Sequence, residues 1–169
     1  WSGYPYEQRL LMQAVESGEV AGLVSFSGDH HMHGAGTISH TNGDLEAKPV
    51  TVDFSCAGIA STPMYDELVE IARDDYPDFQ PLVYRAEGQE LIPVWNMTML
   101  DGVQTAFAFA KTGLKSLARW LGPNAANTGL KYIDSRANGY GLAQFSANDL
   151  QVQLVTMGDV HSPFGQPPE

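Results

Sequence analysis

The sequence predicts an α/β domain, and three patterns support this class. A helical pattern over residues 6–17 leads through a short connection into an apolar strand at residues 23–27, which makes an α-then-β unit. A β-branched stretch at residues 50–56 alternates with period two, as a strand does. Three strand-like segments separated by turn residues, between positions 130 and 157, predict a C-terminal antiparallel meander.

One domain is expected over residues 1–169. The chain is long enough for a packed core, 43% of its residues are apolar, and no internal repeat or low-complexity linker divides it. The first residue is Trp1 rather than Met, so we expect the sequence to begin after processing or within a longer polypeptide.

The first predicted helix, over residues 6–17, has clear start and stop signals. Pro5 suits the first helical turn, and Gly18 ends the helix. Its apolar residues recur at i, i+1, i+4 and i+5, and they are Leu10, Leu11, Ala14 and Val15. The pattern is therefore that of an amphipathic helix that packs one face on the domain.

The loop after the strand at residues 23–27 carries the strongest functional signal. Gly28 lets the backbone turn sharply, so that residues 29–33 lie at the carboxyl end of the strand. Ligand sites of open α/β sheets form at this edge. A carboxylate and an imidazole two residues apart on a tight loop can point into one cavity and hold a metal ion. Asp29 and His31 are therefore candidate metal ligands.

The middle of the chain contains a second helix start and an irregular segment. Thr62 as a cap and Pro63 at the first helical position predict a helix, with acids Asp66 and Glu67 in its first turn. The periodicity weakens over residues 74–99, where prolines and a glycine interrupt it, and this predicts a long irregular excursion.

The rest of the chain is more regular. A buried helix is expected at residues 103–110, ended by Gly113, with a second short helix at residues 114–121. The strands of the predicted meander are at residues 130–134, 140–145 and 150–157, and a Pro/Gly-rich tail follows from residue 161.

Composition disfavours several partner classes. The formal charge of -11 and the pI near 4.7 disfavour a nucleic acid or an anionic membrane as partner, because few Lys and Arg are present to replace counterions. No apolar run approaches the roughly 20 residues that span a bilayer. Cys56 is the single cysteine, which excludes an internal disulfide, and its alternating context predicts a buried strand residue. An acidic chain remains compatible with carboxylates around metal ions.

The order of landmarks in the chain resembles the carboxyl-terminal half of the PhoD-like alkaline phosphatases, a family of metallophosphatases. The landmarks are Trp1-x-Gly3-Tyr4-Pro5, Ser27-Gly28-Asp29-x-His31, Val52-Asp53-Phe54 followed by Ile59-Ala60-Ser61, Leu130-Lys131-Tyr132-Ile133-Asp134, and Asn138-Gly139-Tyr140-Gly141. The resemblance spans most of the chain and is weakest over residues 74–94. This sequence has His30 where the family usually carries Val or Arg.

The resemblance implies part of a four-layer α/β/β/α sandwich that hydrolyses phosphomonoesters and phosphodiesters, with phosphotriesters as a further substrate class. It implies that Asp29 and His31 are ligands of a metal cluster, iron with calcium in this family and zinc or manganese in the wider group. The family's other ligands belong to motifs of the amino-terminal half, which this sequence lacks. The chain is therefore expected to be inactive alone and to form a large interface with a complementary N-terminal segment or chain. Family members are commonly exported by bacteria, which implies a secreted or periplasmic location.

Other histidines offer alternatives. His30 is the predicted catalytic residue, as a group that protonates the leaving oxygen, and His33 is considered for the same role or for pocket lining. A nickel or zinc site built from His30, His31 and His33 is a weaker alternative. A second Gly-Asp-Val-His at residues 158–161 precedes the tail and is interpreted as coincidence. The alternative function is a non-catalytic metal-binding or interaction domain that docks to a partner chain.

Overall fold

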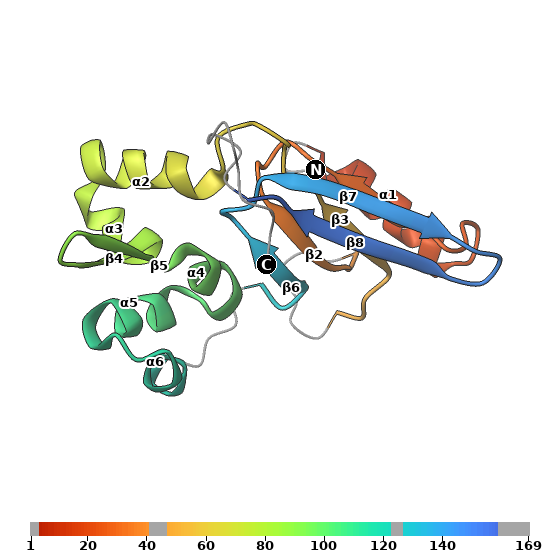
Figure 1. Ribbon diagram of the computed structural model, residues 1–169. Coiled ribbons are helices and arrows are strands. Elements are labelled where there is room, and N and C mark those ends of the chain that lie inside the picture. Colours follow the sequence, from red (N-terminus) through yellow and green to blue (C-terminus); the bar gives the residue numbers. More distant parts are fainter. Residues whose placement is uncertain (1–3, 41–46, 123–126, 159–169) are drawn as a thin grey trace.

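The computed structural model describes residues 4–40, 47–122 and 127–158 (Figure 1). Strands and one helix form a β-rich half, and the segment from residue 64 to 122 forms a helical lobe beside it (Figure 1). Two features of the sequence analysis lie outside the described residues. They are the Trp1-x-Gly3 part of the lead-in and residues 159–161 of the second Gly-Asp-Val-His with the tail that follows.

A four-stranded mixed sheet forms the centre of the β-rich half. Its order is β1-β3-β2-β6, with β1 (Val24–Ser27) parallel to β3 (Thr51–Ser55), while β2 (His33–Ile38) is antiparallel to β3 and to β6 (Leu130–Asp134). Helix α1 (Pro5–Glu16) precedes the sheet. The mixed α/β class is confirmed, together with the predicted helix and the strands observed as β1, β3 and β6, whereas β2 was not predicted as a strand.

The predicted three-stranded meander is wrong in its pairing. β7 (Gly139–Phe145) and β8 (Leu150–Thr156) form an antiparallel hairpin, as expected, but the first strand of the set, β6, pairs with β2. Gly36 of β2 permits this pairing. A Cβ at Gly36 would meet the carbonyl oxygen of Gly129 at 2.6 Å, so only glycine lets the start of β6 approach so closely.

The predicted irregular excursion over residues 74–99 is also wrong. After α2 (Met64–Asp74), this part folds into a short 3-10 turn, a β-hairpin and two helices. These elements are η1 (Pro77–Phe79), α3 (Gln80–Val83), β4 (Tyr84–Glu87), β5 (Glu90–Pro93) and α4 (Trp95–Asp101). The prolines of η1 and α3 lie at the starts of these elements, where proline is tolerated, and Gly88 adopts a φ of +65° in the hairpin turn.

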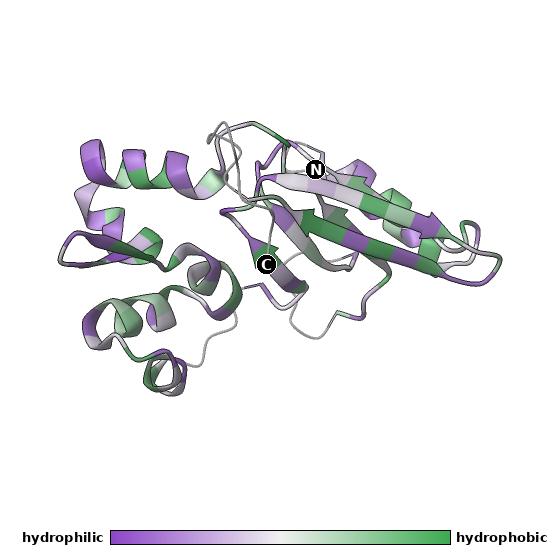
Figure 2. Cartoon of the chain, viewed as in Figure 1, coloured by the Kyte–Doolittle hydropathy of each residue, from purple (hydrophilic) through white to green (hydrophobic). Residues whose placement is uncertain are grey.

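Two apolar clusters hold the helical lobe together. One joins α2 to α3 and β4 through Tyr65, Val69, Ala72, Val83 and Tyr84, and the other joins α4 to α5 (Val103–Thr112) and α6 (Lys115–Leu121) through Val94, Met97, Ala106, Phe109 and Ala118. Figure 2 shows hydrophobic residues, in green, along these helices. The predicted helices that flank Gly113 are confirmed, and among the described helices none is long and apolar enough to cross a membrane.

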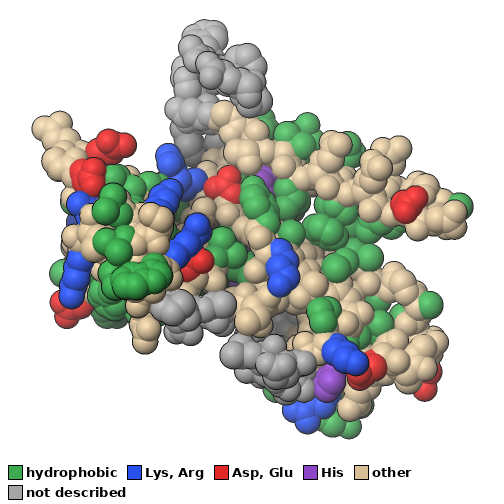
Figure 3. All heavy atoms as spheres, turned by 90° about the horizontal axis from the view of Figure 1, so that it is seen from below, with side chains coloured by type: hydrophobic (Ala, Val, Ile, Leu, Met, Phe, Trp, Pro, Cys, Tyr) green, Lys and Arg blue, Asp and Glu red, His purple; other side chains and the backbone are tan. Residues whose placement is uncertain are grey.

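The β-rich half leaves apolar surface exposed. In Figure 1 the β7–β8 hairpin crosses in front of β2 and β3, while α1 lies behind. The register places Val24, Phe26, Val52 and Phe54 on one face of the sheet, with Phe26 and Phe54 stacked at 5.8 Å between ring centroids. Phe26 is nevertheless 51% exposed, and Phe145 of the hairpin is 70% exposed. Hydrophobic side chains accordingly gather around a hollow on this half in Figure 3.

Candidate functional site

The loop between β1 and β2 has a strained backbone at the two predicted metal ligands. Asp29 has a φ of +72° and His31 a φ of +49°, values that non-glycine residues rarely adopt. Each such residue costs about 1–2 kcal/mol, and strain of this kind clusters at ligand-binding and catalytic sites. β1 ends at Ser27, so the loop follows the carboxyl end of a strand as predicted.

Backbone hydrogen bonds tie this loop to its surroundings. The N–H of Met64, the first residue of α2, donates to the carbonyl oxygen of His31 at 3.0 Å. The N–H of Cys56, just beyond β3, donates to the carbonyl oxygen of Ser27 at 2.9 Å. The strained conformation is therefore fixed from both sides by regular secondary structure.

The imidazole of His31 is oriented through one ring nitrogen. Its Nδ1 lies 2.9 Å from the carbonyl oxygen of Thr62 and 3.2 Å from Oε1 of Glu67. Both partners accept hydrogen bonds, so Nδ1 carries the hydrogen and Nε2 keeps its lone pair in the neutral ring. Histidines that bind metals usually donate their second ring N–H to a carbonyl or a carboxylate in this way. The His31 side chain is 39% exposed.

Asp29 and His30 lie on the same loop and are both exposed. Within the described part of the chain, neither side chain has a hydrogen bond or an ion pair. The carboxylate of Asp29 is therefore free to bind a cation, and the ring of His30 is free to exchange protons with a bound molecule.

Taken separately, Asp29 and His31 are residue types that suit a metal site. A carboxylate oxygen and an imidazole nitrogen suit iron, zinc or manganese. Over residues 4–40, 47–122 and 127–158, however, no group of three or more His, Cys, Asp or Glu side chains is placed to hold an ion. The described residues thus offer two donors, fewer than the three or four protein ligands of a typical transition-metal site.

His33 has a structural role, and the interpretations of it as pocket lining, leaving-group acid or metal ligand are wrong. Its ring is completely buried at the start of β2. The N–H of Ala57 donates to its Nδ1 at 3.0 Å, and its Nε2 lies 3.1 Å from the carbonyl oxygen of Val155. Because both ring nitrogens are used, the three-histidine nickel or zinc site cannot form.

Two polar arrangements near the loop were not identified in the sequence. Glu67 was recognised only as a first-turn acid, and no local pattern links it to His31, which is 36 positions away. The carboxylate of Asp53 accepts hydrogen bonds from Ser25 at 2.5 Å and from Ser27 at 3.2 Å, across the β1–β3 pair.

In α2, burial raises the pKa of the Tyr65 phenol. The Arg136 guanidinium, which lies over the Tyr65 ring, acts on this pKa in the opposite direction.

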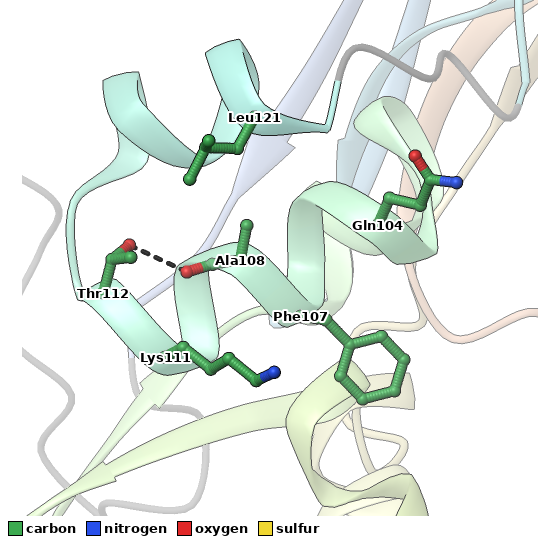
Figure 4. A pocket seen from close by; sticks show the side chains of 6 residues that line it. All are labelled: Gln104, Phe107, Ala108, Lys111, Thr112 and Leu121. Atoms are coloured by element: carbon green, nitrogen blue, oxygen red, sulfur yellow. Dashed lines mark hydrogen bonds between the residues drawn. The ribbon is translucent and has the colours of Figure 1, made fainter.

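A separate groove lies on the helical lobe and includes none of the loop residues (Figure 4). It measures about 490 Å³, is widely open to solvent, and is lined by Gln104, Phe107, Ala108, Lys111, Thr112 and Leu121. Phe107 lines this groove, whereas Phe109 is buried in the core. The groove is thus a surface feature of α5 and α6 and does not serve the histidine loop.

Comparison with known proteins supports the fold. No family model and no curated protein matches the sequence. A solved structure of PhoD is similar, with a TM-score of 0.53 and 13% sequence identity, over 98% of this chain. This chain spans only 22% of that PhoD chain. The chain therefore has a fold like that of one part of PhoD, which agrees with the fold that the sequence resemblance implies.

Proposed function

We propose that this chain is part of a metal-dependent phosphoesterase and that Asp29 and His31 supply two of its metal ligands. The observation that carries the proposal is the orientation of His31, whose Nδ1 faces the Thr62 carbonyl and Glu67 and whose Nε2 remains available. The PhoD-like fold and the strained backbone of the loop add support. We propose phosphomonoesters and phosphodiesters as substrates, with phosphotriesters as a further class, and a secreted or periplasmic location.

The residues of the loop would have distinct roles. Asp29 would bind through a hard oxygen and His31 through a nitrogen, a mixture suited to iron with calcium, or to zinc or manganese. A bound metal cluster would neutralise charge on the phosphoryl oxygens and lower the pKa of a bound water. The exposed ring of His30 would protonate the leaving oxygen, which is the catalytic role that the sequence predicts.

We also propose that a complementary segment of the same enzyme, or a separate chain, completes the site. Two donors alone do not make a catalytic metal centre, so further ligands must come from elsewhere. The exposed apolar faces of the sheet and the hairpin, which include Phe26 and Phe145, are suited to a large interface. The extent of the PhoD chain beyond the similar part is compatible with such a partner.

A second candidate function is a non-catalytic metal-binding or interaction domain that docks to a partner chain. It is favoured by the exposed apolar side chains of the β-rich half, Phe26 and Phe145 among them, which suit docking whether or not a metal is bound. The two functions differ in what docking produces, because only the phosphoesterase gains hydrolytic activity when its interface is filled.

Replacing Asp29 or His31 with alanine is expected to remove metal and activity together. For the protein that contains this chain, each variant should lose at least half of the bound metal, measured by elemental analysis. Each should also lose about 100-fold in kcat/KM, or about 2.7 kcal/mol of transition-state stabilisation, on a chromogenic phosphomonoester and phosphodiester. His161→Ala is the matched control for the second Gly-Asp-Val-His and should leave both quantities unchanged. Full metal content and full rates in the Asp29 and His31 variants would refute the proposal.

The proposed interface predicts concentration-dependent association of the chain when it is studied alone. A double variant, Phe26→Asp with Phe145→Asp, should shift the chain toward monomer in sedimentation velocity experiments, because it places charge on both apolar faces. Leu114→Asp is the control, since Leu114 is 58% exposed but belongs to the helical lobe. Equal effects of the control and the double variant would show that these two faces are not the interface.

A further inference from the structure

We propose that Glu67 is a positioning residue for His31 and that, through it, the first turn of α2 determines which ring nitrogen His31 presents to a metal. This inference rests on the proposed function and adds a residue to it. It is built on the contact between the His31 Nδ1 and Oε1 of Glu67 at 3.2 Å, together with the Thr62 carbonyl at 2.9 Å.

The geometry selects one tautomer of the ring. Two acceptors lie near Nδ1, so the hydrogen is held there, and a free Nε2 lone pair follows. A carboxylate beside the N–H also fixes the orientation of the ring. Thr62 supplies an acceptor from the backbone, whereas Glu67 supplies the charge.

Glu67 can act in this way because α2 is rigidly attached to the β-rich half. The N–H of Met64 binds the backbone of His31, and the N–H of Tyr65 donates to the carbonyl oxygen of Ser135 at 3.0 Å. The side chains of Tyr65 and Val69 are buried in an apolar cluster of the lobe. The carboxylate is therefore carried by a helix whose first turn is joined to the loop and to Ser135 by backbone hydrogen bonds, while its buried side chains anchor it in the lobe.

The contact has little value as a source of stability. The His31 and Glu67 side chains are 39% and 48% exposed, and an exposed ion pair contributes little to the free energy of unfolding. It also counts as an ion pair only when the histidine is protonated, a state that cannot bind a metal through Nε2. Orientation of the neutral ring is thus the effect that this contact can produce.

The test compares Glu67→Ala and Glu67→Gln with Glu70→Ala in the full chain. Glu70 is exposed one turn further along α2 and has no contact with His31, so it controls for loss of a carboxylate. Imidazole nitrogen NMR without metal reports the tautomer, with the His31 signal assigned from a His31→Asn variant. Titration with Mn²⁺ alone reports affinity, through the broadening of amide signals of the loop.

We expect the wild-type ring and the Glu70 variant to carry the hydrogen on Nδ1. Glu67→Ala should move a measurable part of the population to the Nε2–H form and weaken Mn²⁺ binding about tenfold. Glu67→Gln keeps an acceptor and should weaken it less than Glu67→Ala does.

A tautomer and an Mn²⁺ response in Glu67→Ala that equal those of Glu70→Ala would overturn this inference, because the Thr62 carbonyl alone would then orient the ring. The tautomer is measured without metal or substrate. A failure of the proposed function would appear separately, as unchanged metal content and hydrolysis rates in the Asp29→Ala and His31→Ala variants of the protein that contains this chain, while the tautomer still depends on Glu67.

Discussion

Replacing His33 with alanine is expected to lower the free energy of unfolding by about 4 kcal/mol or more. The substitution removes a completely buried ring and leaves a cavity, which costs about 3–5 kcal/mol for large core side chains. It also leaves the N–H of Ala57 and the carbonyl of Val155 without a hydrogen-bond partner. Each such buried group costs about 1–3 kcal/mol of stability. Urea unfolding followed by circular dichroism measures the loss, which is large against a typical stability of about 5–15 kcal/mol.

Two further variants keep this prediction decisive if His33→Ala fails to fold. His33→Gln places an acceptor and a donor on a similar stem, so it should recover part of the lost stability. His30→Ala removes the exposed neighbour of the metal-ligand candidates and should change the unfolding free energy by about 0.5 kcal/mol or less. Wild-type stability in His33→Ala would contradict the buried hydrogen-bond role.

Elements with a complete local pattern could be predicted from the sequence. The helix after Pro5 was identified by its start signal and its apolar spacing, and α5 by the left-handed Gly113 that ends it. β1 and β3 were recognisable as short apolar or alternating runs. In each case the residues that determine the element are neighbours in the chain, so local propensity and periodicity are sufficient to assign it.

The burial of the His33 ring and its two hydrogen bonds could not be predicted from the sequence, for two physical reasons. β2 contains the Gly34-Ala35-Gly36 run, which has low strand propensity and looks like a loop. Its strand state depends instead on pairing with β3 and β6, which lie far along the chain. The partners of the His33 ring are 24 and 122 positions away, and no local pattern reports contacts at such separations.

The candidate site shows the same division. Asp29 and His31 were identified because glycine, acid and histidine follow one another directly after a strand. Glu67 became visible only when α2 placed it against the ring of His31. A sequence motif therefore identifies the candidate donors of a site. The residues that orient those donors can be identified only from the tertiary structure.

Gly139→Ala is expected to destabilise the protein by about 3 kcal/mol, at the place where the hairpin meets the sheet. A Cβ at this position would overlap the carbonyl oxygen of Val155 and would lie 2.8 Å from Nε2 of His33. The carbonyl belongs to the partner strand in the β7–β8 pair, so relief requires a backbone shift that also breaks its bond with His33. For a chain of this length we expect the melting temperature to fall by about 10 °C.

Gly141→Ala is the matched control for this prediction, because it lies two residues further along β7 and on the same face. A Cβ there would lie 3.5 Å from Sγ of Cys56, an ordinary packing distance. Its melting temperature should stay near that of the wild type or rise slightly, because alanine has less freedom than glycine in the unfolded chain. A comparable loss in both variants would mean that strand propensity decides the outcome. A loss confined to Gly139→Ala would show that the close approach of β8 and His33 to β7 requires glycine.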